Sequence, residues 1–456
     1  MARDQVDLTP IERRDELVDW LAQGAKPKSR FRIGTEHEKF AFTLDDHRPV
    51  PYQGRRGIRA LLEGLQHLLG WQPITEGDDV IGLFDVTGGG AISLEPGGQF
   101  ELSGAQLETV HQTSSELMAH LAQVREIARP LQIGFLGIGM TPDWTRADMP
   151  TMPKGRYKIM TAYMPKVGKL GLDMMYRTCT VQTNLDFASE ADMVKKLRVS
   201  IALQPVATAL FANSPFTDGR PNGFLSFRAE IWRDTDWERT GMLPWAFEDG
   251  MGFERWVDYA LDVPMYFVKH GDAYVDVAGQ SFRDLLAGKL RSMPGVRATI
   301  SDWANHLSTI FPEVRLKRYL EMRGADSGPL QNLLALPAFW VGILYDDVSL
   351  DAAWDLVKPW SAAERQQLRD DVPKLGLAAA VRGRAVREIA AEALKLSYAG
   401  LSRRKHLDIS GEDESRYLEV LEERLARGTT PAQELLEKFR GPWNGSVDPI
   451  YAEQAY

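Results

Sequence analysis

Hydrophobic and polar residues follow two different periods along the chain. Helical spacing of apolar residues predicts helices in four early segments, 9–24, 57–70, 105–129 and 190–212. Short apolar runs bounded by glycine or proline predict strands at 31–44, 80–86, 91–94, 99–103, 131–140, 179–187 and 223–232. After about residue 300 the pattern is almost entirely helical, over 331–345, 361–371, 379–402, 412–427 and 430–439. This order favours an α+β fold, with an antiparallel or mixed sheet in the first 280 residues and a helical C-terminal portion.

The composition excludes several classes of protein. The 456 residues include 54 Lys and Arg and 63 Asp and Glu, which gives a net charge of −9 and disfavours nucleic acid as a partner. The longest apolar stretch, 333–345, is too short to cross a bilayer, so no membrane partner is expected. The N-terminal segment is charged and lacks the apolar centre of a secretory signal, which predicts a cytoplasmic protein. Cys179 is the single cysteine, so no intramolecular disulfide can form.

Three common catalytic motifs are missing from the sequence. It contains no P-loop, no zinc-binding H-E-x-x-H helix and no G-x-S-x-G nucleophile elbow. These absences exclude the commonest nucleotide-binding and hydrolase classes, but they leave the use of ATP through another fold open. The candidate chemistry must therefore come from side chains that lie apart in the sequence.

Glu36 and Glu38 form the first candidate site. In a strand the side chains alternate between faces, so both carboxylates project from one face, which they share with Phe40 and Phe42. Two such carboxylates repel each other unless a cation lies between them or one of them keeps its proton. The alternative is an exposed acidic strand face without a ligand.

A second pair of acids, Glu95 and Glu101, flanks a predicted hairpin. The turn sequence EPGG lies between the strands 91–94 and 99–103. Glu101 alternates with apolar neighbours, so its carboxylate faces away from the apolar side, toward solvent or toward a site. An ordinary surface hairpin with two acids is the alternative.

The charged segment 313–326 is a third candidate, and its helical spacing predicts a helix. Basic residues surround Glu321 within one or two turns, and Glu321 and Arg323 share a face if the segment becomes a strand there. A metal-ligating acid beside a guanidinium suits a phosphoryl group, because the metal neutralises oxygens that the arginine also holds. A salt-bridged surface helix is the alternative.

Further basic residues lie among glycines, prolines and predicted strands, namely Lys154, Arg156, Arg177 and Arg228. A buried arginine needs an anionic partner, which is either a structural acid or a substrate carboxylate. Acids from separate segments suit Mg²⁺, which prefers hard oxygen ligands and bridges substrate phosphates. Together these residues suggest two or three Mg²⁺ ions at a sheet surface, with nucleotide phosphates.

Around these same residues the sequence resembles a known family. The strings FRIGTEHEKFAF, GGGAISLEPGGQFELSG, MMYRTCTVQTNLDF and FPEVRLKRYLEMRGAD are similar to glutamate–cysteine ligase, also called γ-glutamylcysteine synthetase, of the plant and proteobacterial type. The likeness runs from about residue 30 to the ending SVDPIYAEQAY. It implies a glutamine-synthetase-like fold, in which a curved, mostly antiparallel sheet forms a bowl-shaped active site with helices outside. One catalytic domain over 1–456 is expected, sheet-rich over 1–300 and mainly helical over 301–456.

The resemblance also implies a reaction. ATP phosphorylates the γ-carboxylate of L-glutamate, and the amine of L-cysteine displaces the phosphate to give γ-glutamylcysteine, the first step of glutathione biosynthesis. ATP is the expected co-substrate, Mg²⁺ the expected cofactor, and a monomer or homodimer the expected state. Plant members carry cysteines tied to redox control; with Cys179 alone, the intramolecular form of that control cannot operate here.

Residue roles carry over from the resemblance position by position. The predicted metal ligands are Glu36, Glu38, Glu95, Glu101, Gln182 and Glu321. The predicted catalytic residues are Arg228, Glu321 and Arg323. The predicted substrate or phosphate contacts are Lys154, Arg156, Arg177, Arg228 and Arg323.

Two other functions remain open at this point. A ligase of the same superfamily could join the glutamate γ-carboxylate to a different amine, because the metal and phosphate residues do not distinguish acceptors. A non-catalytic nucleotide-binding or glutamate-binding protein is the second alternative, and the retained acids and Arg323 argue against it.

Overall fold

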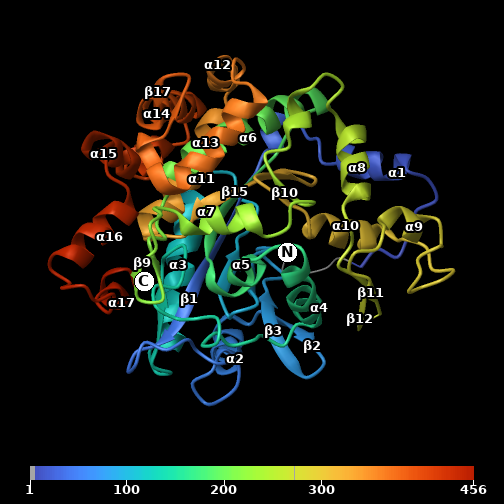
Figure 1. Ribbon diagram of the computed structural model, residues 1–456, viewed down its shortest axis with the longest axis horizontal. Coiled ribbons are helices and arrows are strands. Elements are labelled where there is room, and N and C mark those ends of the chain that lie inside the picture. Colours follow the sequence, from blue (N-terminus) through green and yellow to red (C-terminus); the bar gives the residue numbers. More distant parts are fainter. Residues whose placement is uncertain (1–5, 272) are drawn as a thin grey trace.

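A nine-stranded sheet forms the centre of the structure, a computed structural model that describes residues 6–271 and 273–456 (Figure 1). The strands run in the order β14-β15-β7-β1-β5-β4-β3-β2, and β6 pairs with the far part of β1. All pairings in this sheet are antiparallel, which confirms the predicted α+β class. Its strands are β1 (Ile33–Thr43), β2 (Gln72–Glu76), β3 (Asp79–Phe84), β4 (Ala91–Leu94), β5 (Phe100–Ser103), β6 (Ile133–Leu136), β7 (Thr180–Leu185), β14 (Val314–Leu316) and β15 (Leu320–Asp326).

Smaller two-stranded sheets lie outside the central one. β10 pairs with β13 in parallel, and the other three pairs are antiparallel. Their strands are β8 (Phe216–Thr217), β9 (Arg220–Pro221), β10 (Thr240–Gly241), β11 (Phe267–His270), β12 (Ala273–Asp276), β13 (Phe311–Pro312), β16 (Ala380–Val381) and β17 (Arg384–Ala385).

Several long helices pack against the apolar face of the sheet. α6 packs on β14 and β15, and α11 packs on β7 and β1. α2 packs on β3, and α3 packs on β1 and β6. The helices are α1 (Asp15–Ala22), α2 (Ile58–Leu69), α3 (Val110–Ala128), α4 (Gly155–Tyr163), α5 (Gly171–Arg177), α6 (Glu190–Leu210), α7 (Phe227–Ile231), α8 (Phe253–Asp262), α9 (Phe282–Leu286), α10 (Ile300–Ser308), α11 (Leu330–Leu344), α12 (Asp347–Val357), α13 (Ala362–Leu375), α14 (Val386–Arg404), α15 (Glu419–Arg427), α16 (Pro431–Arg440) and α17 (Ile450–Glu453).

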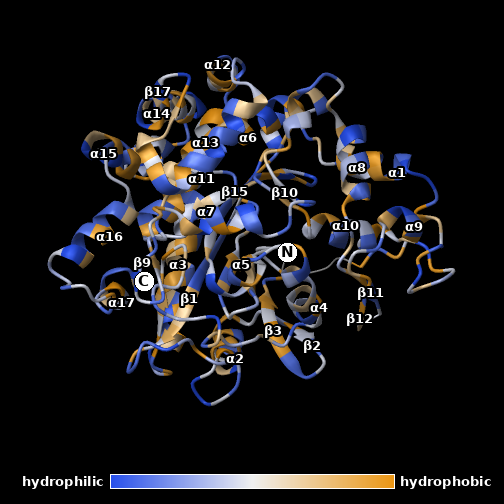
Figure 2. Ribbon diagram, viewed as in Figure 1, coloured by the Kyte–Doolittle hydropathy of each residue, from blue (hydrophilic) through white to orange (hydrophobic). Residues whose placement is uncertain are grey.

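The two faces of the sheet differ in chemistry because side chains alternate along each strand. On the helix-covered face Ile33, Val181, Leu185 and Leu320 are fully buried in the main core. Outer helices such as α8 and α15 carry hydrophobic residues toward this interior and hydrophilic residues elsewhere, and both kinds are visible on them in Figure 2. The opposite face of the strands carries the acids and amides.

Two predicted elements have the wrong type. The segment 223–232 contains a short helix, α7, rather than a strand, because Ser226 caps it by accepting a hydrogen bond from Ala229 N. The segment 313–326 forms the two strands β14 and β15 rather than a helix. Its apolar residues recur at every second position, and this alternation suits a strand between a core and a polar face.

Two further observations complete the fold. Among the residues that the structure describes, no single helix is long and apolar enough to cross a membrane; α11 and α12 reach that level only as a pair bent by 91°. Cys179 is a free thiol buried in an apolar cluster with Phe40 and Trp144, and burial raises its pKa well above the ordinary value.

Candidate active site

A cavity opens on the polar face of the sheet, and its walls come from segments that are far apart in the sequence. It contains about 900 Å³ of space, part of which is open to solvent. Among the described residues, its charged lining comprises four glutamates and four arginines: Glu36, Glu38, Glu95, Glu101, Arg156, Arg228, Arg315 and Arg323. The lining also includes Gln182, so the structure brings together most of the side chains that the sequence singled out.

Strand pairing brings the acids together. Glu38 on β1 lies directly opposite Glu101 on β5, and Glu36 lies opposite Gln182 on β7. Side chains opposite each other on one face of an antiparallel pair are separated by only about 5 Å at their Cβ atoms. The hairpin turn after β4 adds Glu95 at the edge of this row.

Burial and mutual repulsion raise the pKa values of the acids on β1. Burial raises the pKa of Glu36, and the charges of Glu321 and Glu101 raise it further. Burial also raises the pKa of Glu38 well above its ordinary value, together with the charges of Glu95 and Glu101. A cation bound among these carboxylates would offset both effects.

Neighbouring donors fix the direction of each carboxylate. Asn184 Nδ2 donates to Glu36 Oε1 (2.8 Å), and the backbone N–H of Thr180 donates to Glu38 Oε2 (2.9 Å). The hydroxyl of Ser93 donates to Glu101. Each of these carboxylates therefore keeps acceptor capacity that its protein donors do not use.

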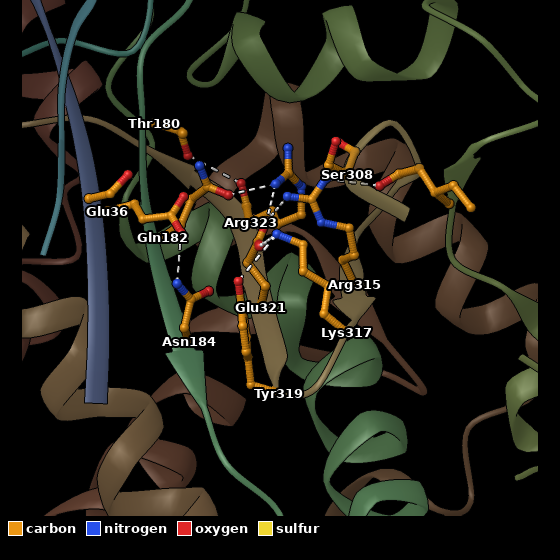
Figure 3. Close-up of polar contacts among 12 residues, drawn as sticks. Glu36, Thr180, Gln182, Asn184, Ser308, Arg315, Lys317, Tyr319, Glu321 and Arg323 are labelled. Atoms are coloured by element: carbon orange, nitrogen blue, oxygen red, sulfur yellow. Dashed lines mark hydrogen bonds and ion pairs between the residues drawn. The ribbon is translucent and has the colours of Figure 1, made fainter. Parts of the chain in front are cut away.

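A different arrangement surrounds Glu321, which is fully buried between three cations (Figure 3). Arg315 Nη2 lies 2.6 Å from Glu321 Oε1, Lys317 Nζ lies 2.8 Å from Oε2, and Arg323 also contacts Oε1. Burial alone would raise the pKa of Glu321, but Arg315, Lys317 and Arg323 together hold it well below its ordinary value. Arg323 also donates to Gln182 Oε1 (2.6 Å), which connects this cluster to β7.

Arg228 enters the cavity from α7 with hydrogen-bonding capacity to spare. Its side chain is 2% exposed and donates from Nη2 to the backbone oxygen of Arg323 (3.0 Å), but its Nε and Nη1 have no partner among the described residues. Such buried, unsatisfied N–H groups are costly unless an anion accepts from them. Arg228 therefore has the properties of an anion-binding residue.

Asp326, at the end of β15, holds α7 and Arg228 in place. Its fully buried carboxylate accepts hydrogen bonds from Ser214 Oγ (2.7 Å) and Ser226 Oγ (2.9 Å). Ser226 caps α7, and Ser214 Oγ accepts from Arg228 N (3.1 Å). Burial lowers the pKa of Arg228, and the charge of Asp326 opposes that shift.

The donor set fits Mg²⁺, although no metal centre is already formed. Among residues 6–271 and 273–456, no three His, Cys, Asp or Glu side chains have the arrangement of a metal site. Carboxylate and amide oxygens that face one cavity are nevertheless the hard ligands that Mg²⁺ takes, and it usually keeps several waters beside a few protein ligands. The raised pKa values of Glu36 and Glu38 are consistent with a missing positive charge.

The comparison with known families agrees with this geometry. The profile of the family described as glutamate-cysteine ligase family 2 matches residues 32–453 of the chain. The chain belongs to this family. The family profile thus covers every residue of the candidate site, and the family assigned from sequence strings is confirmed.

Curated relatives of this glutamate–cysteine ligase family align over almost the whole chain. The glutamate–cysteine ligase of Medicago truncatula is 56% identical over 453 residues, which is 99% of this chain and 87% of that protein. The enzyme of Arabidopsis thaliana is 56% identical over 97% of this chain and 83% of that protein. Ligase B of rice is 54% identical over 99% of this chain and 89% of that protein.

The names of these relatives correct one prediction. They describe the relatives as chloroplastic, which contradicts the cytoplasmic location expected from the sequence. That expectation rested on the charged N-terminal segment, which argues only against a secretory signal. It carries no information about import into organelles.

A solved structure supports the fold of this family member. The glutamate–cysteine ligase of Francisella tularensis, in complex with AMP, superposes with a TM-score of 0.56 over 90% of this chain and 85% of that chain, at 11% identity. At this identity the likeness concerns the fold alone. The glutamine-synthetase-like class expected from the family is confirmed.

Two of the predicted substrate contacts lie outside the cavity lining in this family member. Arg177 is held by Asp173 (3.0 Å) and Asp218 (2.5 Å), so its guanidinium already has two structural acids. Lys154 is buried, donates to the backbone oxygen of Leu94 (2.7 Å), and has a pKa lowered to about 8 by burial. Arg156 does line the cavity, and its Nε has no hydrogen-bond partner in the part of the chain that the structure describes.

Sequence reasoning missed several lining residues. Arg315 lies opposite Glu321 across β14 and β15; the sequence places it in the charged cluster around Glu321 but assigns it no role in the site, because the segment is predicted as a helix. The alternation of Val314, Arg315 and Leu316 was the signal that a strand assignment would have used. Tyr157, whose hydroxyl donates to Glu95 Oε1 (3.3 Å), carried no recognisable pattern.

Proposed function

We propose that this enzyme uses ATP to join the γ-carboxylate of L-glutamate to the amine of L-cysteine, the first step of glutathione biosynthesis. The observation that carries the proposal is the single cavity in which acids from β1 and the β4–β5 hairpin face arginines from α7, β14 and β15. Its setting in a member of the glutamate–cysteine ligase family supports this choice of substrates.

The reaction needs activation because a carboxylate is a poor electrophile. The γ-phosphoryl group of ATP passes to a γ-carboxylate oxygen of glutamate; the new P–O bond forms as the bond to ADP breaks. The cysteine nitrogen then forms a bond to the γ-carbon, the C–O bond to phosphate breaks, and the amine proton leaves with phosphate or water. No covalent enzyme nucleophile takes part, in agreement with the missing nucleophile motifs.

The acids of the cavity are proposed to hold the cofactor. Glu36, Glu38, Glu95 and Glu101 would ligate Mg²⁺, and Gln182 and Glu321 complete the predicted set of ligands for two or three ions. Bound Mg²⁺ neutralises phosphate oxygens and so favours in-line transfer. Glu321 is fully buried behind the cavity lining among three cations, so it can become a ligand only if these side chains rearrange.

The arginines are proposed to bind the anionic substrates. Arg228 has two free N–H groups for a glutamate carboxylate, and Arg323 lies beside it as the phosphate clamp. Arg156, on the opposite side of the cavity near Glu95, offers a third cation for phosphate. A guanidinium suits these roles because its planar fork matches carboxylate and phosphate oxygens.

We also propose that the chain acts as one catalytic domain. β14 and β15, from the part after residue 300, join the central sheet through β7, and Glu321 and Arg323 reach the site on them. The proposal leaves the expected state, a monomer or a homodimer, unchanged.

The test is an ADP-release assay with glutamate, ATP and Mg²⁺, in which cysteine is compared with other amines at equal concentration. We expect release that depends on both glutamate and cysteine, with γ-glutamylcysteine identified by mass spectrometry. Faster release with another amine would assign the enzyme to a different acceptor. Nucleotide and glutamate binding without any release would support a non-catalytic binding protein.

A further inference from the structure

Gln99 connects the turn of the β4–β5 hairpin to the segment that joins α5 to β7. Its side chain is 1% exposed, and its Nε2 donates to the backbone oxygens of Met175 (3.1 Å) and Thr178 (3.0 Å). Its Oε1 accepts from the backbone N–H of Gly97 (2.9 Å), and its own carbonyl oxygen accepts from Glu95 N (3.0 Å). Gln99 thus makes hydrogen bonds that close the turn and others that attach the turn to residues 175–178.

The shape of the turn reinforces this connection. A Cβ atom at Gly97 would lie 2.3 Å from the backbone oxygen of Tyr176 and 3.0 Å from Met149 Cε. A backbone oxygen cannot move aside without shifting α5, so only glycine fits at this position. The turn is therefore docked closely against residues 175–178.

Both ends of this connection lead to acids of the cavity. Glu95 lies in the turn and Glu101 lies two residues after Gln99. On the other side, the segment that receives the turn continues into β7, where Thr180 N donates to Glu38 Oε2 (2.9 Å). The position of Glu95 relative to Glu38 therefore depends on how the turn is docked, whereas strand pairing already sets Glu101 opposite Glu38.

We propose that Gln99 is a positioning residue, which fixes Glu95 relative to Glu38 and Glu101 and so pre-forms the divalent cation site. The inference rests on the proposed function, in which these acids ligate Mg²⁺. Without the Gln99 amide, two buried backbone carbonyls lose their donor, and the turn is released from α5. Groups that orient metal ligands typically contribute about 10- to 100-fold in metal affinity.

The experiment measures Mn²⁺ binding to the full chain by electron paramagnetic resonance, without substrates, in the wild type and in Gln99→Met. Methionine is close in size to glutamine but makes neither of the two donor bonds. We expect Mn²⁺ affinity to fall about 10-fold or more. Far-ultraviolet circular dichroism and thermal unfolding establish that the variant is folded.

Gln204→Met is the matched control. Gln204 is also 1% exposed, and its side-chain amide has no hydrogen-bond partner within the described part of the chain. The same substitution there should leave Mn²⁺ affinity unchanged, so a loss confined to Gln99→Met reflects the docking of the turn.

The possible failures are distinguishable. Equal Mn²⁺ affinity in the wild type and Gln99→Met overturns the inference alone, whereas no Mn²⁺ binding by the folded wild type overturns the proposed metal site as well. If Gln99→Met does not fold, Gln99→Asn, which is too short to reach both carbonyls, replaces it. If neither variant folds, Gln99 is a structural residue and the inference is wrong.

Discussion

The two walls of the cavity have opposite electrostatic properties. On the acidic wall, formed by Glu36, Glu38, Glu95 and Glu101, burial and the charges of neighbouring acids raise the pKa values of Glu36 and Glu38. The basic wall, formed by Arg228, Arg315 and Arg323, is backed by the fully buried Glu321, whose pKa Arg315, Lys317 and Arg323 hold low. Glu321 is therefore neutralised by three cations within the protein, whereas Glu36 and Glu38 face mainly other acids. The comparison indicates a cation site on one wall and an anion site on the other.

The largest expected effect is on the free energy of unfolding, when a glutamate of one wall or the other is replaced by glutamine. Glu321→Gln leaves Arg315, Lys317 and Arg323 without their shared acid in a fully buried position. Removing one partner of a buried ion pair typically costs about 3–5 kcal/mol of unfolding free energy. Urea denaturation of the metal-free protein measures this loss, and an unchanged midpoint would contradict the proposed charge balance.

The same substitution on the acidic wall should act on turnover instead of stability. Glu38→Gln removes a charge that Glu95 and Glu101 repel, so the metal-free protein should be as stable as the wild type or more stable. Turnover should fall about 10²- to 10³-fold, the usual loss when a group that stabilises transition-state charge is removed. Near wild-type turnover in Glu38→Gln would refute its assignment as a metal ligand.

A smaller effect, on KM, should show which substrate binds to Arg228 on the basic wall. In Arg228→Lys an ammonium replaces a fork with two free N–H groups, so the KM for glutamate should rise about 10- to 100-fold, equivalent to about 1.4–2.8 kcal/mol. The KM for ATP should change much less. Steady-state kinetics with each substrate varied in turn test this; a selective rise in the KM for ATP would place the nucleotide, not glutamate, at Arg228.

The smallest effect concerns the pH dependence of metal-free stability. Glu36 and Glu38 have folded pKa values above the ordinary 4.5, so the native state binds more protons than the unfolded state in the window above 4.5. Stability should therefore fall as the pH rises through that window, by at most about 1.4 kcal/mol per pH unit for each group. The lowered pKa of Glu321 acts oppositely, because its stabilisation is lost as the pH falls below 4.5.

Denaturation midpoints of metal-free protein across this range test the assignment. The double variant Glu36→Gln/Glu38→Gln should have a flatter profile than the wild type above pH 4.5. Identical profiles in the two proteins would indicate that other groups titrate there.

Strand alternation made the acidic wall predictable. Glu101 lies between Phe100 and Leu102, and Glu36 and Glu38 are two positions apart in one strand with Phe40 and Phe42, so period two predicts a shared face once the strands are recognised. The basic wall was less accessible, because its charges also recur at helical spacing and concealed the alternation of β14 and β15. Local patterns of charge and hydrophobicity conflicted in that segment, and contact with the core decided between them.

Residues that depend on distant partners could not be placed from the sequence. Arg177 meets Asp218, 41 residues away in the turn between β8 and β9, and this contact occupies a guanidinium that was predicted to bind substrate. Arg228 faces the cavity because Asp326, on another element, holds α7 through two serines. Neither arrangement leaves a signal at short range in the sequence.

Anomalous diffraction from crystals grown with Mn²⁺, glutamate and a non-hydrolysable ATP analogue tests the central claim most directly. The account predicts Mn²⁺ peaks within ligand distance of Glu36, Glu38, Glu95 and Glu101, and phosphate oxygens between those peaks and the arginines of the basic wall. Nucleotide bound elsewhere, with no Mn²⁺ near any of these four carboxylates, would contradict it.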